Sequence, residues 1–151
     1  MVSFSVSGRI SRPVAETFEA VVNPERLSGY FTTGGADGRL ESGATVFWSF
    51  ADFPGRFPVQ VVEVVENQRI VLRWASDEGS GEDGERQTTV TMDFEALEDG
   101  RTLVTIREEG WQDTEKGRKA SYGNCEGWTQ MLCCLKAYVE HGINLRQGYY
   151  T

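Results

Sequence analysis

One long stretch near the end of the chain, residues 122–146, has the apolar spacing of a single helix face. Its large apolar side chains recur mostly at intervals of three and four residues, and they are Trp128, Met131, Leu132, Leu135, Tyr138, Val139 and Ile143. No earlier segment keeps this period over such a length, because the preceding chain is dominated by strand patterns. We therefore expect one long helix to cover one curved antiparallel sheet, with any binding site between the two layers.

The N-terminal segment is expected to form one strand followed by two short helices. Residues 2–10 alternate between apolar and polar side chains, which is the period of a strand. Ser11 can then cap a helix that ends at Asn23, because the residue before a proline avoids the helical region. Pro24 begins a second short helix that is expected to run to about Tyr30.

The middle of the chain reads as a series of further strands separated by turns. The expected strands are residues 39–40, 45–50, 57–66, 69–74, 88–97 and 102–108. Along the last of them, Val104, Ile106 and Glu108 share one face, so all three should point toward the helix. The acidic, glycine-rich segment 76–85 cannot bury apolar surface, and we expect it to be an exposed, mobile loop.

Composition indicates an ordinary globular chain and excludes several kinds of partner. The 151 residues fit a single domain over residues 1–151, and the formal net charge of −8 argues against nucleic acid and against an anionic membrane surface. No apolar run approaches the ~20 residues of a membrane-spanning helix, and the N-terminus lacks the pattern of a secretory signal. Cys125, Cys133 and Cys134 are odd in number, which favours reduced thiols packed as small apolar groups and a cytoplasmic location.

Several segments carry a resemblance to a known family. They are residues 10–27, 57–74, 88–95 and 100–106, with Gly127 and Trp128 opening the last helix. Through them the chain resembles, over roughly residues 4–146, the activator-of-heat-shock-protein-ATPase homology family of the START-like, or SRPBCC, superfamily. The resemblance implies an α+β helix-grip fold, in which a curved antiparallel sheet wraps around a long C-terminal helix and two short helices follow the first strand. Relatives usually end the second short helix with Trp-Trp or Trp-Phe, where this chain has Tyr30 and Phe31.

The resemblance also implies a cavity or deep groove between the helix and the sheet. Superfamily members include lipid and hormone carriers, aromatic polyketide cyclases and co-chaperone domains. The same side chains could instead fill a core, but the four tryptophans favour a cavity, because flat rings line spaces that branched aliphatic groups would close. The expected lining residues are Tyr30, Phe31, Trp48, Phe50, Val59, Val61, Trp74, Met92, Phe94, Ile106, Trp111, Trp128, Met131, Leu132 and Leu135.

A second hypothesis concerns acid–base chemistry at Glu108. A carboxylate buried there could act as general acid or base in a cyclase- or dehydratase-like reaction, with Tyr122 and Trp111 as neighbours. Alternatively, the strand ends just before Glu108, which would then be solvated beside Lys116 or Arg118. No second carboxylate or histidine stands at a spacing that would complete a proton relay.

No pattern indicates a metal, a cofactor or a covalent nucleophile. His141 is expected to face away from the apolar side of the helix, the glycines near residue 35 form no phosphate-binding fingerprint, and no serine has the Gly-x-Ser-x-Gly setting. The leading hypothesis is non-catalytic binding of a small hydrophobic or aromatic molecule by a monomer or homodimer. The alternatives are a co-chaperone-like module that binds a chaperone or another protein, and an enzyme that uses Glu108.

Overall fold

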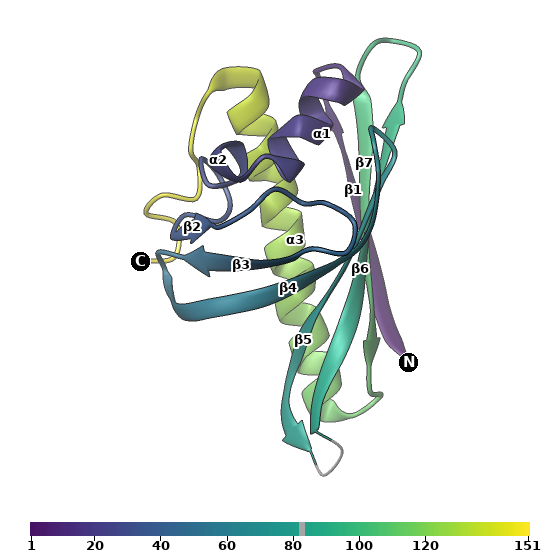
Figure 1. Cartoon of the computed structure of the whole chain (residues 1–151), viewed down its shortest axis with the longest axis vertical. Helices are drawn as coiled ribbons and strands as arrows, with labels where there is room; N and C mark the ends of the chain where they lie inside the picture. The colour runs from purple at the N-terminus through teal and green to yellow at the C-terminus, as the bar shows by residue number, and fades with distance from the viewer. Residues whose placement is uncertain (82–83) are drawn as a thin grey trace.

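The computed structural model describes residues 1–81 and 84–151, with side-chain surroundings for all of these except residues 79–81, 84 and 85. One antiparallel sheet curves around a long helix, and its strand order is β1-β7-β6-β5-β4-β3-β2 (Figure 1). The strands are β1 Val2–Ile10, β2 Gly35–Ala36, β3 Thr45–Phe50, β4 Phe53–Val65, β5 Arg69–Gly81, β6 Gly84–Ala96 and β7 Thr102–Trp111. The helices are α1 Val14–Val22, α2 Pro24–Leu27 and α3 Glu115–His141. This is the helix-grip fold that the resemblance implied.

The long helix α3 is placed differently from the expected stretch at both ends. It begins at Glu115 instead of Tyr122, because the Thr114 side chain caps it by accepting a hydrogen bond from the Gly117 N–H at 3.0 Å. It ends at His141, where Gly142 adopts a left-handed conformation with φ 68°. Ile143 therefore lies beyond the helix and is 49% exposed, so its expected place in the packed face was wrong.

Smaller boundaries also differ from expectation. The short strand β2 is Gly35–Ala36, which pairs with β3, and residues 39–40 are not in a strand. Ser11 does not cap α1, whose N-cap residue is Pro13 without a side-chain hydrogen bond. Asn23 instead caps α2, accepting hydrogen bonds from the N–H groups of two residues that follow it.

The acidic segment 76–85 is mainly strand, so the expectation of an exposed loop was wrong for most of its backbone. β5 continues to Gly81 and β6 begins at Gly84, while residues 82 and 83 lie outside the described part. Two strands pair through backbone hydrogen bonds, which do not depend on apolar side chains. The polar composition of this segment therefore did not indicate its strand structure. Glu78 is even buried, and its Oε1 accepts a hydrogen bond from the Gln112 N–H at 2.7 Å.

The core lies between the concave side of the sheet and one face of α3. Trp128, Met131, Leu132 and Leu135 of α3 are buried, as their spacing predicted.

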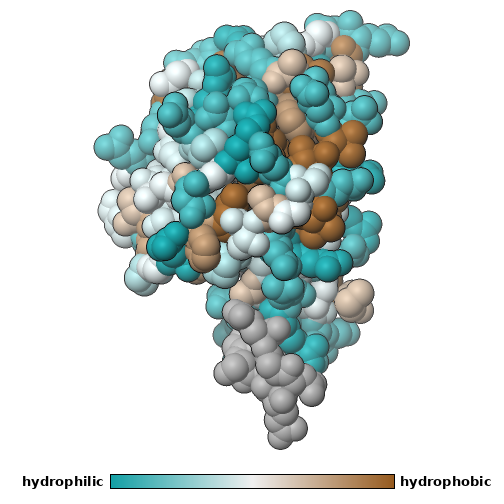
Figure 2. Space-filling view, viewed as in Figure 1, coloured by the Kyte–Doolittle hydropathy of each residue, from teal (hydrophilic) through white to brown (hydrophobic). Residues whose placement is uncertain are grey.

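On the face seen in Figure 2 the surface is largely polar, and apolar patches are confined to its middle and one side. Across the described residues, no helix is both long and apolar enough to cross a lipid bilayer. These elements leave α3 in contact with the sheet over most of its buried face.

Buried Tyr30 gives the fold a dependence on alkaline pH. Its hydroxyl donates to the Ala20 carbonyl at 3.0 Å, and burial raises the pKa of Tyr30 well above its usual value of 10.0. A phenol whose pKa is higher in the folded state contributes stability that is fully present below the unfolded-state pKa. This contribution is lost as pH rises from about 10 through the folded-state pKa, because the unfolded chain then releases the proton more readily. We expect Tyr30→Phe to cost about 1 kcal/mol at neutral pH and to flatten the decline of stability above pH 10. Urea unfolding from pH 7 to 11 measures this, and Tyr122→Phe, at a position 67% exposed, is the control that should leave the profile unchanged.

Candidate ligand-binding pocket

A buried carboxylate lies at the centre of the contact between α3 and the sheet. The alternation of β7 turns Glu108 toward α3 together with Val104 and Ile106, and Glu108 is 0% exposed. The expectation that Glu108 points inward is confirmed, and the alternative of a solvated Glu108 is wrong.

Four side chains from β5, β6 and α3 donate hydrogen bonds to this carboxylate. Oε2 accepts from Thr88 Oγ1 at 2.6 Å and from Trp74 Nε1 at 2.9 Å, while Oε1 accepts from Trp128 Nε1 at 2.8 Å. Asn124 Nδ2 lies 3.1 Å and 3.0 Å from the two oxygens. A buried carboxyl group is tolerated when its lone pairs are met by fixed donors, and these hydrogen bonds tie the helix to two strands.

Three of the four donors, Trp74, Asn124 and Trp128, also form one wall of a pocket. The pocket has a volume of about 560 Å³ and opens between α3, the β3–β4 hairpin and the end of the chain. Its lining residues are Phe31, Phe50, Phe53, Phe57, Trp74, Ala75, Asp77, Gly123, Asn124, Glu126, Gly127, Trp128, Arg146 and Tyr150. Trp74 and Trp128, both held by Glu108, stand with ring centroids 5.5 Å apart. The wall is therefore aromatic and its orientation is fixed from behind.

The residues expected to line a cavity fall into two groups. Phe31, Phe50, Trp74 and Trp128 line this pocket. The others lie deeper or elsewhere and pack without lining it: Tyr30, Trp48, Val59, Val61, Met92, Phe94, Ile106, Trp111, Met131, Leu132 and Leu135. Strand parity shows which side chains point inward, and close packing then decides which of them are covered by neighbours. Of the helix residues expected to line a cavity, Trp128 borders the pocket, whereas Met131, Leu132 and Leu135 are buried in the core.

A sequence comparison identifies the family of the chain. The sequence model of the family described as Activator of Hsp90 ATPase homolog 1-like protein matches residues 11–140. The chain belongs to this family. A comparison with curated proteins gave no match.

Solved structures of similar proteins share the fold. Protein SSP2350 from Staphylococcus saprophyticus is 29% identical, with a TM-score of 0.79 over 96% of both chains. The Aha1 dimer from Colwellia psychrerythraea is 20% identical, with a TM-score of 0.73 over 94% of this chain and 98% of that one. CalU16 from Micromonospora echinospora is 17% identical, with a TM-score of 0.69 over 95% of this chain and 78% of that one. The chain therefore has the fold of these proteins.

Several residues that line the pocket were not predicted from the sequence. Gly123 and Gly127 lie on the pocket side of α3, and a Cβ added to either would meet no atom within 4 Å. Asn124 precedes Trp128 by one helical turn, a spacing that could have indicated a shared partner on the sheet. Phe53 was expected in a break between strands and Phe57 at the start of a strand. Both line the pocket, where they are 50% and 38% exposed.

Arg146 reaches the pocket from the C-terminal tail, residues 142–151. The tail returns from the end of α3 toward β2 and β3 (Figure 1). Arg146 Nη2 lies 3.1 Å from Asp52 Oδ1, and the two side chains are only 6% and 9% exposed. The guanidinium also lies over the rings of Phe50 and Tyr150, at 4.8 Å and 5.3 Å from their centroids. The tail is therefore held over the pocket by one buried ion pair and by stacking.

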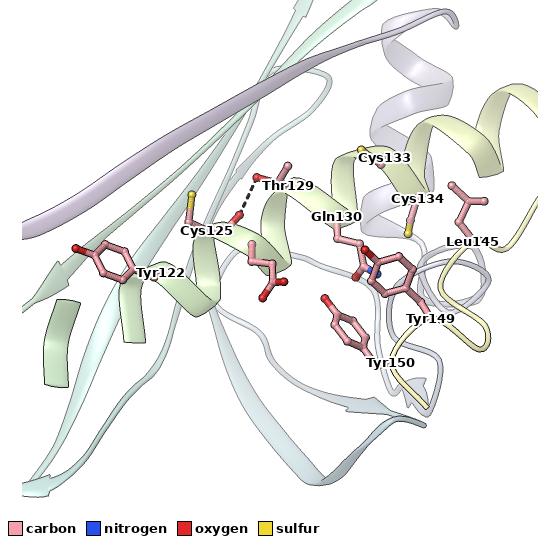
Figure 3. A pocket seen from close by; sticks show the side chains of 10 residues that line it. Tyr122, Cys125, Thr129, Gln130, Cys133, Cys134, Leu145, Tyr149 and Tyr150 are labelled. Carbon is pink, nitrogen blue, oxygen red and sulfur yellow. Dashed lines mark hydrogen bonds between the residues drawn. The ribbon is translucent and has the colours of Figure 1, made fainter. Parts of the chain in front are cut away.

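A second groove of about 670 Å³ follows the outer side of α3 beneath the tail (Figure 3). Its lining residues are Tyr122, Cys125, Glu126, Thr129, Gln130, Cys133, Cys134, Leu145, Tyr149 and Tyr150. The expectation that the cysteines are reduced agrees with the three free thiols. Only Cys134 is buried, however, and Cys133 is exposed, so the expected packing of all three was wrong. Burial raises the pKa of the Cys134 thiol above its usual value, which keeps it protonated and a poor nucleophile.

Titratable groups elsewhere form no metal site within residues 1–81 and 84–151. His141 is exposed at the end of α3, as expected. Trp111 is buried away from Glu108, and its Nε1 donates to the Ser76 carbonyl at 3.0 Å. Tyr122 is exposed in the outer groove, so neither side chain that was expected beside Glu108 is among the residues bonded to it.

Proposed function

We propose that this protein binds a small, flat, apolar molecule in the pocket between α3 and the sheet, without changing it chemically. The observation that carries the proposal is the aromatic wall of Phe31, Phe50, Trp74 and Trp128. Glu108 holds the two tryptophans of this wall in place from behind. Ligand sites are typically concave and largely apolar, with a few placed polar groups, and the pocket volume of about 560 Å³ is within their usual range.

The expected affinity follows from the surface that such a ligand would bury. About 300 Å² of apolar surface at roughly 25 cal/mol/Å² contributes near 7 kcal/mol. The loss of translational and rotational freedom offsets much of this, so dissociation constants in the micromolar range are expected. Aromatic ligands gain in addition from contacts with the rings, about 1 kcal/mol for a well-placed pair.

The environment of Glu108 favours binding over catalysis. Both of its oxygens already accept hydrogen bonds from protein donors, and Glu108 is not among the residues that line the pocket. A general base must reach the proton that it removes, directly or through one water. The role of Glu108 in this proposal is to position Trp74 and Trp128.

The assembly and location proposed for the protein rest on less direct observations. A cytoplasmic location agrees with three free cysteines in a chain without a disulfide between described residues. A homodimer is the alternative to a monomer, because the Aha1 protein from Colwellia psychrerythraea is described as a dimer. We propose that residues 1–151 form one domain, because the described strands all belong to a single sheet. A chaperone-binding role has no comparable observation behind it, and part of the acidic segment that it would use is paired between β5 and β6, with Ser80 opposite Glu85 and Gly81 opposite Gly84.

Blocking the pocket tests the proposal. Gly127→Leu places a side chain into open space inside the pocket, and replacing a helical glycine does not cost helix propensity. We expect a neutral, environment-sensitive apolar probe such as 6-propionyl-2-(dimethylamino)naphthalene, and neutral naphthalene derivatives that displace it, to bind the wild type with micromolar affinity. Gly127→Leu should weaken this at least tenfold, with unfolding midpoints unchanged or raised.

The matched control places leucine in the other groove. Cys133→Leu adds an apolar side chain to the outer groove of α3 and leaves the pocket untouched. Its probe affinity should equal that of the wild type. If Cys133→Leu abolishes binding while Gly127→Leu does not, or if the wild type takes up no probe, the pocket is not the binding site.

A further inference from the structure

Three hydrogen-bond donors in the pocket wall are already engaged by one carboxylate of the protein. Trp74 Nε1, Trp128 Nε1 and Asn124 Nδ2 all donate to Glu108, at distances between 2.8 Å and 3.1 Å. An indole has a single N–H and no acceptor, so these two tryptophans offer a ligand only their rings. The amide of Asn124 is oriented by the carboxylate, which fixes its nitrogen toward Glu108 and its oxygen on the other side.

Arg146, the cation among the described lining residues, has partners for both of its terminal nitrogens, whereas its buried Nε has none. Arg146 Nη2 pairs with Asp52 at 3.1 Å, and Nη1 lies 3.4 Å from Gln130 Oε1. Both members of the ion pair are nearly inaccessible to water, so an anionic ligand would have to separate them. Removing one partner from a buried pair leaves the other charge uncompensated, which opposes the binding of a carboxylate or phosphate there.

The acceptors at the pocket are by contrast free. Asp77 on β5 and Glu126 on α3 line it from its two opposite layers, and both are exposed. Within the described part of the chain, neither carboxylate has an ion pair or hydrogen bond, and Asn124 Oδ1 has no donor. Together with the formal net charge of −8, this arrangement makes the pocket mouth electronegative.

The rings of the pocket already hold one delocalised cation. The Arg146 guanidinium lies 4.8 Å from the centroid of Phe50 and 5.3 Å from that of Tyr150. Aromatic faces attract cations through their quadrupole, and several rings around one space add to this attraction. A ring-lined space with acidic groups at its mouth is complementary to an organic cation with an apolar body.

We propose that the ligand of this pocket is a flat aromatic molecule that carries a protonated amine. Its ring lies against Trp74, Trp128 and Phe50, and its ammonium group faces Asp77 and Glu126, with Asn124 Oδ1 as a further acceptor. This inference rests on the proposed binding function and specifies the chemistry of the ligand. The pocket selects against acidic aromatic molecules of the same shape, because Asp77 and Glu126 would repel them and the donors of Trp74, Trp128 and Asn124 are used internally.

Three ligands with one ring system separate charge from shape. 2-Naphthylmethylammonium, 2-naphthylmethanol and 2-naphthoate are titrated calorimetrically into the full chain at pH 7. We expect the ammonium to bind best and the carboxylate worst, with at least about a tenfold difference between them. The preference for the ammonium should shrink as the salt concentration rises. If the carboxylate binds as tightly as the ammonium, or more tightly, the inference is overturned while the proposed binding function stands. If none of the three binds, the proposed function fails and this inference with it.

Neutralising each carboxylate tests the two named residues. Asp77 has a positive φ of 62°, a conformation that asparagine also tolerates, so Asp77→Asn keeps the backbone. We expect Asp77→Asn and Glu126→Gln each to weaken binding of the ammonium about two- to fivefold and to leave the alcohol unchanged. Glu98→Gln removes an equal charge from an exposed turn away from the pocket and should change neither ligand. If Glu98→Gln weakens binding of the ammonium as much as the two pocket variants do, the preference for the ammonium comes from the net charge of the protein. The proposed role of Asp77 and Glu126 would then be overturned.

Discussion

Glu108→Gln is expected to lower the free energy of unfolding by about 3 kcal/mol, although the two side chains have nearly the same shape. The carboxylate accepts hydrogen bonds from Thr88, Trp74, Trp128 and Asn124 in a site without exposed surface. A glutamine has one acceptor oxygen, and its own NH₂ would face donors. Each buried donor left without a partner costs about 1–3 kcal/mol. Urea unfolding at neutral pH measures the change.

Glu108→Ala should cost more, about 5 kcal/mol, because it adds a cavity and leaves every donor unpaired. The matched control is Glu109→Gln. Glu109 follows directly along β7, but its side chain is 41% exposed and pairs with Arg107 at 3.1 Å, so about 0.5 kcal/mol or less is expected. Tryptophan emission should shift in both Glu108 variants and stay fixed in the control, because Glu108 holds two indoles. Wild-type stability in Glu108→Gln would show that the hydrogen bonds of this carboxylate do not stabilise the fold.

Arg146→Met is expected to release the C-terminal tail and to cost about 3 kcal/mol. The substitution keeps much of the apolar length of the side chain and leaves Asp52 buried without its partner, and breaking one side of a buried ion pair typically costs about 3–5 kcal/mol. The tail can move away and let water reach Asp52, so we expect the loss of stability to lie at the lower end of this range. Urea unfolding gives the stability, and limited proteolysis should show faster cleavage within residues 142–151.

A double variant separates the ion pair from the packing of the tail. Asp52→Asn combined with Arg146→Met removes both charges, and it should recover part of the stability that Arg146→Met alone loses. Because Arg146 also stacks on Phe50 and Tyr150, full recovery is not expected. Arg56→Met, at an ion pair that is 64% and 48% exposed, is the control and should cost less than about 1 kcal/mol. If Arg146→Met leaves stability and proteolysis unchanged, the tail is not held by this residue.

The sequence by itself determined the two layers and their facing sides. The three- and four-residue spacing from Trp128 to Leu135 gave the buried face of α3, and the alternation along β7 turned Glu108 inward. Both are local periodicities of a helix and a strand, so they can be recognised without knowledge of any partner. Helix ends were less predictable, because a polar cap such as Thr114 extends α3 beyond its apolar stripe.

Only the tertiary structure decided which inward side chains meet a pocket and which meet a neighbour. Trp48 and Trp74 both point inward, but Trp48 is fully covered while Trp74 lines the pocket. Coverage depends on how distant segments pack, and the tail that brings Arg146 over Phe50 has no periodic pattern. The same holds for Glu108: parity gave its direction, whereas its four donors come from three separate elements. Those donors turn a candidate catalytic acid into the anchor of an aromatic wall, and they are assembled only when α3 packs on the sheet.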